Sequence, residues 1–206
     1  SDLTEPDATG YTPIHWAALT GNAEAVRQLA SHGVNVNTTG LIGRTPLVML
    51  CDLLDKGHCR IDKSKGVDTI EALLEAGADT EVTNKHGQRP LELACYNSQP
   101  HPESITQRMM ETLIKHGAKT DITDARGNTL FHMAISSQNG TQVDDIGRVR
   151  LLAEHGLSPN TQNNLGEAPI MRAIKNGNAN ICEYLIKNGA DLGLVTASGQ
   201  TIFHCA

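Results

Sequence analysis

The residues of this chain that could do chemistry are histidines, cysteines and carboxylates, and their spacing limits what that chemistry can be. The segment 52–66, DLLDKGHCRIDKSKG, holds Asp52, Asp55, His58 and Cys59, whose side chains are all possible metal ligands. No pair among them has the spacing of a known zinc site, and neither an H-E-x-x-H nor a phosphate-loop pattern occurs in the chain. We therefore expect no metal, no cofactor and no catalytic residue.

Three histidines, His15, His132 and His204, recur at one position of a repeated pattern. A catalytic histidine is needed once, beside a nucleophile and an orienting group, so recurrence favours a structural role in each copy. The cysteines are odd in number and form no C-x-x-C pair. Cys51 and Cys95 occupy the same place in two copies, which predicts buried apolar side chains and a reducing compartment.

Two rows of glycines set out the elements that must position these residues. The first row, which we call the anchor glycines, precedes an inner-helix opening by two residues and consists of Gly10, Gly43, Gly87, Gly127, Gly166 and Gly199. The second row, the closing glycines, follows a leucine by four residues and consists of Gly33, Gly77, Gly117, Gly156 and Gly189. The anchor spacings are 33, 44, 40, 39 and 33 residues. Such self-similarity indicates small units that bury their apolar faces only by stacking on one another.

After each anchor glycine the same opening returns, as TPIHWAA (12–18), TPLVMLC (45–51), RPLELAC (89–95), TLFHMAI (129–135), APIMRAI (168–174) and TIFHCA (201–206). A period of about 33 residues with a T-P-L-H-x-A-like opening resembles the ankyrin repeat. The copies lie at about 7–38, 39–82, 83–122, 123–161 and 162–193, with a partial sixth at 194–206. The resemblance implies that residues 1–206 form a single all-α domain, an ankyrin-repeat solenoid of stacked helix–turn–helix units with projecting hairpin-like loops.

The pattern of each copy predicts an inner helix followed by an outer helix. In four copies a proline begins the inner helix. Pro13, Pro46, Pro90 and Pro169 fall at the first helical position, where a missing N–H costs nothing. The outer helix carries an apolar trio at i, i+3 and i+4 that we expect to meet its neighbours in adjacent copies. These trios are Val26/Leu29/Ala30, Ile70/Leu73/Leu74, Met110/Leu113/Ile114, Val149/Leu152/Ala153 and Cys182/Leu185/Ile186. Trp16 is either a binding anchor or inner-helix packing, and we expect packing.

Copies 2, 3 and 4 carry extra residues between their helices, within 52–66, around 96–102 and near 136–147. Because stacked units keep their loops in line, these insertions should lie along one edge. They form either a second contact surface or surface loops that the chain tolerates, since lengthening a loop costs little. Leu41 and Ile42, in the turn of copy 2, are likewise either a contact or packing against the neighbouring turn.

The composition argues against several other classes of protein. A formal net charge of −6 and the lack of a Lys/Arg stripe argue against nucleic-acid binding. No apolar run approaches the ~18 residues of a membrane-spanning helix, and no charged-then-apolar leader opens the chain. We expect no membrane insertion, a monomer, and a cytoplasmic location, which would be the host cytoplasm for a secreted effector.

The resemblance implies binding of another protein on the concave face, built from the residues beside each anchor glycine and the end of each inner helix. From the positions carried over from the family we assign partner binding to Tyr11, Leu41, Ile42, Arg44, Lys85, His86, Gln88, Tyr96, Arg126, Asn128 and Glu167. Among them we favour Tyr11, Arg44 and Tyr96, because Tyr and Arg dominate interface hot spots.

An alternative is a targeting or substrate-recruitment domain of a larger multidomain enzyme or secreted pathogen effector. It is suggested by the first copy, which looks internal, and by the sixth, which stops inside its first helix, so that we expect a fragment of a longer protein. Asn37 and Asn160 each lie eight residues after a leucine, as in ankyrin substrates of asparaginyl hydroxylase. The sequence leaves open whether either is modified.

Overall fold

The computed structural model describes residues 3–40, 43–56, 61–96, 103–135 and 146–204. Leu41, Ile42 and most residues of the three insertions lie outside these ranges, so the two interpretations of each stay open. The described residues contain α-helices, one 3-10 helix and a single isolated β-bridge, between Thr123 and Thr129, but no strand. The chain divides into two compact units, Ser1–Lys119 and Thr120–Ala206. The predicted all-α class is confirmed.

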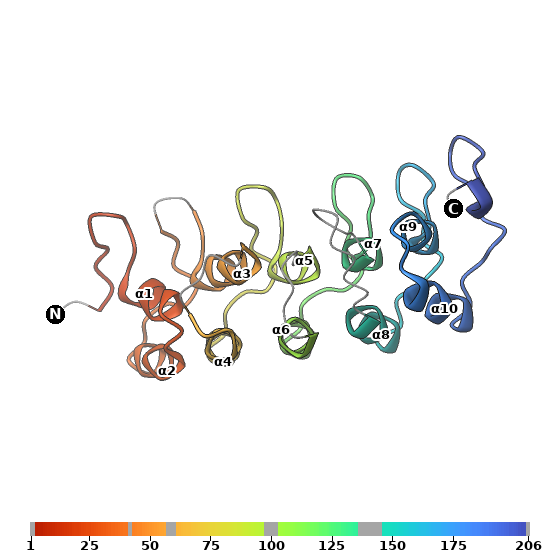
Figure 1. The fold of residues 1–206 in the computed structure, drawn as a ribbon. Helices are drawn as coiled ribbons and strands as arrows, with labels where there is room; N and C mark the ends of the chain where they lie inside the picture. The colour runs from red at the N-terminus through yellow and green to blue at the C-terminus, as the bar shows by residue number, and fades with distance from the viewer. Residues whose placement is uncertain (1–2, 41–42, 57–60, 97–102, 136–145, 205–206) are drawn as a thin grey trace. The chain divides into compact units, whose positions relative to one another are not determined.

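Unit 1 is built from three pairs of antiparallel helices. Their bounds are α1 Pro13–Leu19, α2 Ala23–Ser31, α3 Pro46–Lys56, α4 Lys63–Glu75, α5 Pro90–Tyr96 and α6 Glu103–Lys115. The inner helices α1, α3 and α5 pack side by side, and the outer helices α2, α4 and α6 do the same. Within this unit the inner helices lie between the outer helices and the projecting hairpin loops (Figure 1).

Unit 2 repeats this arrangement with two helix pairs. Their bounds are α7 Leu130–Ile135, α8 Ile146–Glu154, α9 Pro169–Lys175 and α10 Ala179–Lys187, followed by the 3-10 helix η1 Ile202–His204. The inner helices α7 and α9 pack together, η1 continues that layer, and α8 packs on α10. The hairpins of this unit again project beyond its inner helices (Figure 1).

The prolines open their helices as predicted. Pro13, Pro46, Pro90 and Pro169 are the first residues of α1, α3, α5 and α9. The preceding threonines differ in what their hydroxyls do. Thr45 accepts a hydrogen bond from the Val48 N–H at 3.4 Å, whereas the Thr12 hydroxyl bonds to Nδ1 of His15 at 2.9 Å.

The predicted trios form the outer-helix core only in part. Their first two residues are at most 1% exposed in copies 2 and 3, where Ile70, Leu73, Met110 and Leu113 lie. The third residue was expected to pack equally well, but Ile186 is 50% exposed. The equivalent Leu74 of copy 2 is only 5% exposed, so the burial of the third residue differs between copies.

Cys51 and Cys95 are free and fully buried, as their shared position in the repeat predicts. Burial of the Cys51 thiol raises its pKa, so the reactive thiolate is disfavoured. Both cysteines act as small apolar residues of neighbouring inner helices.

Candidate protein-binding face

Four of the hairpin loops are held by an aspartate or asparagine side chain three residues before the anchor glycine. Asp7, Asn84, Asp124 and Asn163 each use one side-chain oxygen to accept two backbone N–H groups, two and four residues further on. The Asp124 bonds measure 2.8 Å to Arg126 and 2.8 Å to Asn128. Such Asx turns fix the loop backbone locally. This position did not figure among the predicted residues, although the recurring [D/N]-x-x-G pattern could have shown it.

Neighbouring hairpins in unit 2 are also joined to each other. The Asn164 N–H donates to the Arg126 carbonyl at 3.0 Å, and the Ala197 N–H donates to the Leu165 carbonyl at 2.8 Å. A Cβ added to Gly127 would lie 2.9 Å from the Asn164 backbone nitrogen, and one added to Gly166 would lie 2.5 Å from that of Ala197. These two anchor glycines are therefore needed for the close approach of consecutive hairpins as well as for their turns.

The recurring histidines have the structural role that their repetition predicts. In His15 the Nε2–H donates to the Arg44 carbonyl at 3.2 Å, and in His132 it donates to the Glu167 carbonyl at 2.8 Å. Because Nε2 faces a carbonyl, it must carry the proton, which leaves Nδ1 free to accept from Thr12 or Thr129. Each of these histidines thus ties its own helix start to the hairpin of the next copy.

In unit 1 the predicted binding residues are exposed to different degrees. Lys85 and His86 are exposed at the tip of the third hairpin. Gln88 is half-buried, with its amide oxygen bonded to Asn84 at 3.0 Å. Tyr96, at the end of α5, is half-buried. Tyr11 is also half-buried, and its ring fills the space where a Cβ on Gly40 would lie 2.9 Å away.

Arg44 is less available than predicted. Its Nη1 lies 2.8 Å from Oδ2 of Asp52, and the two side chains are only 15% and 6% exposed. A guanidinium that a buried carboxylate already binds is a poor hot spot, because a partner would have to displace that carboxylate. We therefore reassign Arg44 from partner contact to the packing of copy 2.

In unit 2 Arg126 is exposed at a hairpin tip, whereas Asn128 is only 3% exposed. Its amide oxygen accepts from Asn163 at 2.9 Å and from Arg172 at 3.0 Å. Asn128 therefore joins two copies and is not available to a partner, which corrects its predicted role. Its polar type suggested a surface position, but burial is decided by the neighbouring copy.

Glu167 is paired with cations of its own copy. Lys175 donates a short hydrogen bond to Glu167 and holds the pKa of that carboxyl below its usual range. Glu167 and Lys175 stand one and nine residues after their anchor glycine, as Arg44 and Asp52 do in copy 2 with the charges exchanged. An ion pair between these positions holds each hairpin against the end of its inner helix.

Trp16 is 46% exposed, so the expected inner-helix packing is wrong. Its Nε1–H donates to Oδ2 of Asp7 at 2.7 Å, and its ring meets Tyr11 edge-on at 5.9 Å. A hydrogen bond from the Thr9 hydroxyl, joined by the one from Trp16, lowers the pKa of Asp7 to about 2. The equivalent residues Met49 and Met133 are at most 3% exposed; within their own units α3 packs between α1 and α5, and α7 packs on α9.

Comparison with known proteins agrees with this arrangement of hairpins and helix pairs. A family model described as ankyrin repeats (3 copies) matches residues 1–61, and one described as ankyrin repeats (many copies) matches residues 152–206. The chain belongs to the ankyrin-repeat family. Ankyrin repeats are protein-interaction modules, and ankyrin domains are generally non-catalytic.

Two curated proteins are similar to this ankyrin-repeat chain over nearly its whole length. It is 26% identical over 210 residues to a B-cell lymphoma 3 protein homolog of Mus musculus, covering 98% of this chain and 42% of the relative. It is 26% identical over 201 residues to the palmitoyltransferase AKR1 of Lachancea kluyveri, covering 97% of this chain and 25% of the relative. The chain thus spans less than half of either protein.

A solved structure gives a similar ankyrin-repeat chain. It is the complex of the predatory endopeptidase Bd0816 from Bdellovibrio bacteriovorus with the immunity protein Bd3460. One chain there aligns with a TM-score of 0.70 and 25% identity, covering 98% of this chain and 91% of that one.

Among the described residues, no helix has both the length and the apolar character needed to cross a membrane.

Proposed function

We propose that this ankyrin-repeat chain binds another protein through its hairpin tips and the adjoining ends of its inner helices. One observation carries the proposal: exposed side chains stand on loops whose backbone is already fixed. Lys85 and His86 follow the Asn84 turn directly, and Arg126 follows the Asp124 turn. Binding through such side chains orders little backbone, so less of the interaction energy is lost to entropy.

The proposal assigns contact residues separately in the two units. In unit 1 they are Tyr11, Lys85, His86, Gln88 and Tyr96, together with the predicted Leu41 and Ile42. In unit 2 they are Arg126, Glu167 and the neighbouring Leu165, which is 64% exposed. Glu167 is kept as a rim residue, because its carboxylate is already neutralised within its own copy.

The test makes the same charge reversal, from a basic residue to glutamate, on hairpin tips and on outer helices. Lys85→Glu and Arg126→Glu change tips, whereas Lys115→Glu and Lys187→Glu change exposed lysines of α6 and α10. A partner captured by the intact chain and identified by mass spectrometry is then titrated against each variant. We expect the tip variants to weaken binding more than tenfold and the outer-helix variants to leave it within twofold. Equal loss from both sets would place the contact elsewhere.

The same proposal includes a single binding domain that acts as a monomer in a reducing, cytoplasmic compartment. The free buried thiols of Cys51 and Cys95 support that compartment, because neither serves a disulfide. Light scattering on the purified chain tests the monomer, since a mass near 44 kDa instead of 22.1 kDa would contradict it.

A second function is recruitment within a larger protein. It is supported by the similarity to a palmitoyltransferase of which this chain spans 25%. The complex that contains the structural neighbour also pairs an enzyme with an immunity protein. Under this alternative the ankyrin repeats hold a substrate or inhibitor for a separate catalytic domain. Deleting residues 1–206 from the full-length protein should then raise the KM for a protein substrate and leave turnover of a small model substrate unchanged.

A further inference from the structure

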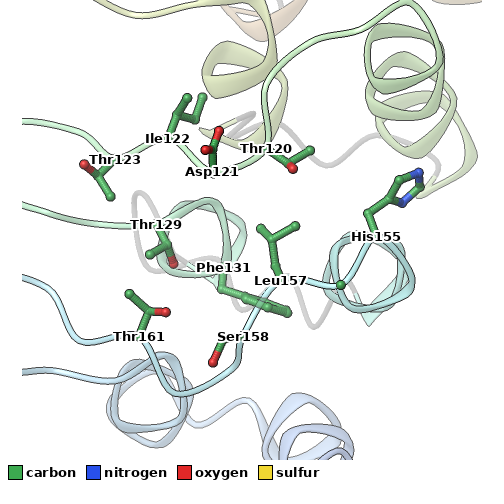
Figure 2. A pocket seen from close by; sticks show the side chains of 11 residues that line it. Thr120, Asp121, Ile122, Thr123, Thr129, Phe131, His155, Leu157, Ser158 and Thr161 are labelled. Carbon is green, nitrogen blue, oxygen red and sulfur yellow. The ribbon is translucent and has the colours of Figure 1, made fainter.

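Unit 2 contains a cavity of about 330 Å³ between the segments 120–123 and 157–161. Figure 2 shows these segments on either side of the start of α7. Ile122, Phe131 and Leu157 supply its apolar lining, and Thr120, Thr123 and Thr161 supply hydroxyls. Its volume is at the lower end of the range for small-ligand sites, roughly 300–1,000 Å³.

At two other places in the chain, the equivalent pair of segments is joined by the side chain of one asparagine, which we call the clip. The clip residue stands four positions after a closing glycine. The Asn37 amide donates to the Gly77 carbonyl at 3.0 Å and accepts from the Asp79 N–H at 2.8 Å. Asn160 makes the same two bonds, to Gly189 at 2.9 Å and from Asp191 at 2.8 Å. The clip thus needs a side chain that both donates and accepts.

The cavity lies where the clip position holds Asp121. A carboxylate accepts hydrogen bonds but donates none, so it cannot bond to the Gly156 carbonyl as Asn37 bonds to Gly77. Among the hydrogen bonds of the described residues, none joins Asp121 to Gly156 or Ser158. Asp121 and Gly156 both line the cavity and both are exposed, and no clip donor joins the carboxylate of the one to the carbonyl of the other.

Glu81, the other acidic residue at a clip position, also accepts a hydrogen bond without donating one. Its carboxylate accepts from the Lys119 N–H at 3.2 Å, and it lies 3.2 Å from the guanidinium of Arg89. The acid of copy 2 is thus accompanied by a cation of copy 3. Among the described residues that line the cavity beside Asp121, none is a lysine or arginine. The Nδ1–H of His155 is used by the Leu151 carbonyl at 2.9 Å.

We propose that this cavity binds a protonated primary amine carried on a short aliphatic stem. The ammonium group has three N–H donors, which match the Asp121 carboxylate, the Gly156 carbonyl and a threonine hydroxyl. The stem lies against Ile122, Phe131 and Leu157. The carboxylate disfavours an anion, and no lysine or arginine stands among the described lining residues to neutralise one. The amine is either a free alkylamine or the lysine side chain of a bound protein, and the site does not depend on the proposed function.

The test titrates n-butylamine into the isotopically labelled chain at pH 7 and follows backbone amide shifts by NMR. We expect saturable shifts at Asp121, Ile122 and Leu157 with a millimolar dissociation constant, and no saturable shift with n-butanol. Asp121→Asn should weaken butylamine binding at least tenfold, because it removes the charge and provides the donor that completes the clip. Glu154→Gln, which removes another exposed negative charge at the end of α8, should leave the dissociation constant within twofold.

Nα-acetyl-lysine methylamide serves as the second probe and distinguishes the two sources. Binding tighter than that of butylamine assigns the cavity to a lysine of a partner, and equal or weaker binding assigns it to free amines. Asp121→Asn is expected to fold, because asparagine occupies the same position in two other copies. The proposal is overturned if butylamine gives no saturable shifts in the intact chain, or if Asp121→Asn and Glu154→Gln weaken its binding equally.

Discussion

Replacing His132 tests whether a buried histidine makes unit 2 sensitive to acid. The side chain is fully buried, and burial lowers its pKa from 6.5 to about 4. The hydrogen bond to the Glu167 carbonyl opposes this shift, as do the nearby Glu167 and Asp124 carboxylates, whereas Arg172 adds to it. Protonation would also remove the acceptor that Nδ1 offers to Thr129.

The difference between a pKa of 6.5 in the unfolded chain and about 4 in the folded one corresponds to roughly 3 kcal/mol. Between these values the unfolded state binds the extra proton, so the free energy of unfolding falls as the pH falls. The contribution is complete above pH 6.5 and is lost as the pH approaches 4. Below that value both states are protonated and this histidine causes no further loss.

The assay is urea unfolding of the intact chain and of His132→Leu between pH 7 and pH 4.5, followed by far-UV circular dichroism. Circular dichroism reports both units, whereas the single tryptophan, Trp16, lies in unit 1. The variant starts less stable but should lose about 2–3 kcal/mol less than the intact chain over this range. Met133→Ala, a buried neighbour that does not titrate, should lower stability at every pH and keep the slope of the intact chain.

Equal pH dependence in the intact chain and in His132→Leu would refute the reasoning. A direct NMR titration of the His132 ring offers a second check, because it does not depend on the variant folding. A ring that titrates near pH 6.5 in the folded chain would equally contradict the burial argument.

Three further predictions concern stability. Leu113→Ala should cost roughly 2–5 kcal/mol in chemical denaturation, because Leu113 is fully buried in α6, and a loss under about 0.5 kcal/mol would contradict the assigned register. Asp121→Asn should raise the free energy of unfolding by about 1 kcal/mol through the completed clip, and the melting temperature should rise with it; an unchanged or lower value would show that no clip forms. Arg44→Ala should cost about 3 kcal/mol because Asp52 stays buried, whereas Arg44→Leu combined with Asp52→Leu should cost less; the reverse order in urea unfolding would contradict a buried pair.

The repeats and their helix starts were predictable because their signals are local. A proline at the first helical position, a glycine in a turn and an apolar stripe each act within a few residues of the chain. The recurrence of His15 and His132 also indicated a structural bond, which the carbonyls of Arg44 and Glu167 confirm. The Asx turns at Asp7 and Asn84 were equally local, and the pattern that marks them was present but not used.

By itself, therefore, the sequence determined the family, the succession of inner and outer helices and the loops that project from them. Only the tertiary structure decided which side chains remain available to a ligand. Trp16 is exposed where the equivalent Met49 and Met133 are buried, and Asn128 is buried although it flanks an anchor glycine. The same holds for Asp121, whose missing clip becomes visible only beside Gly156. The physical reason is that burial and hydrogen bonding at these positions depend on residues one repeat away, which no local pattern records.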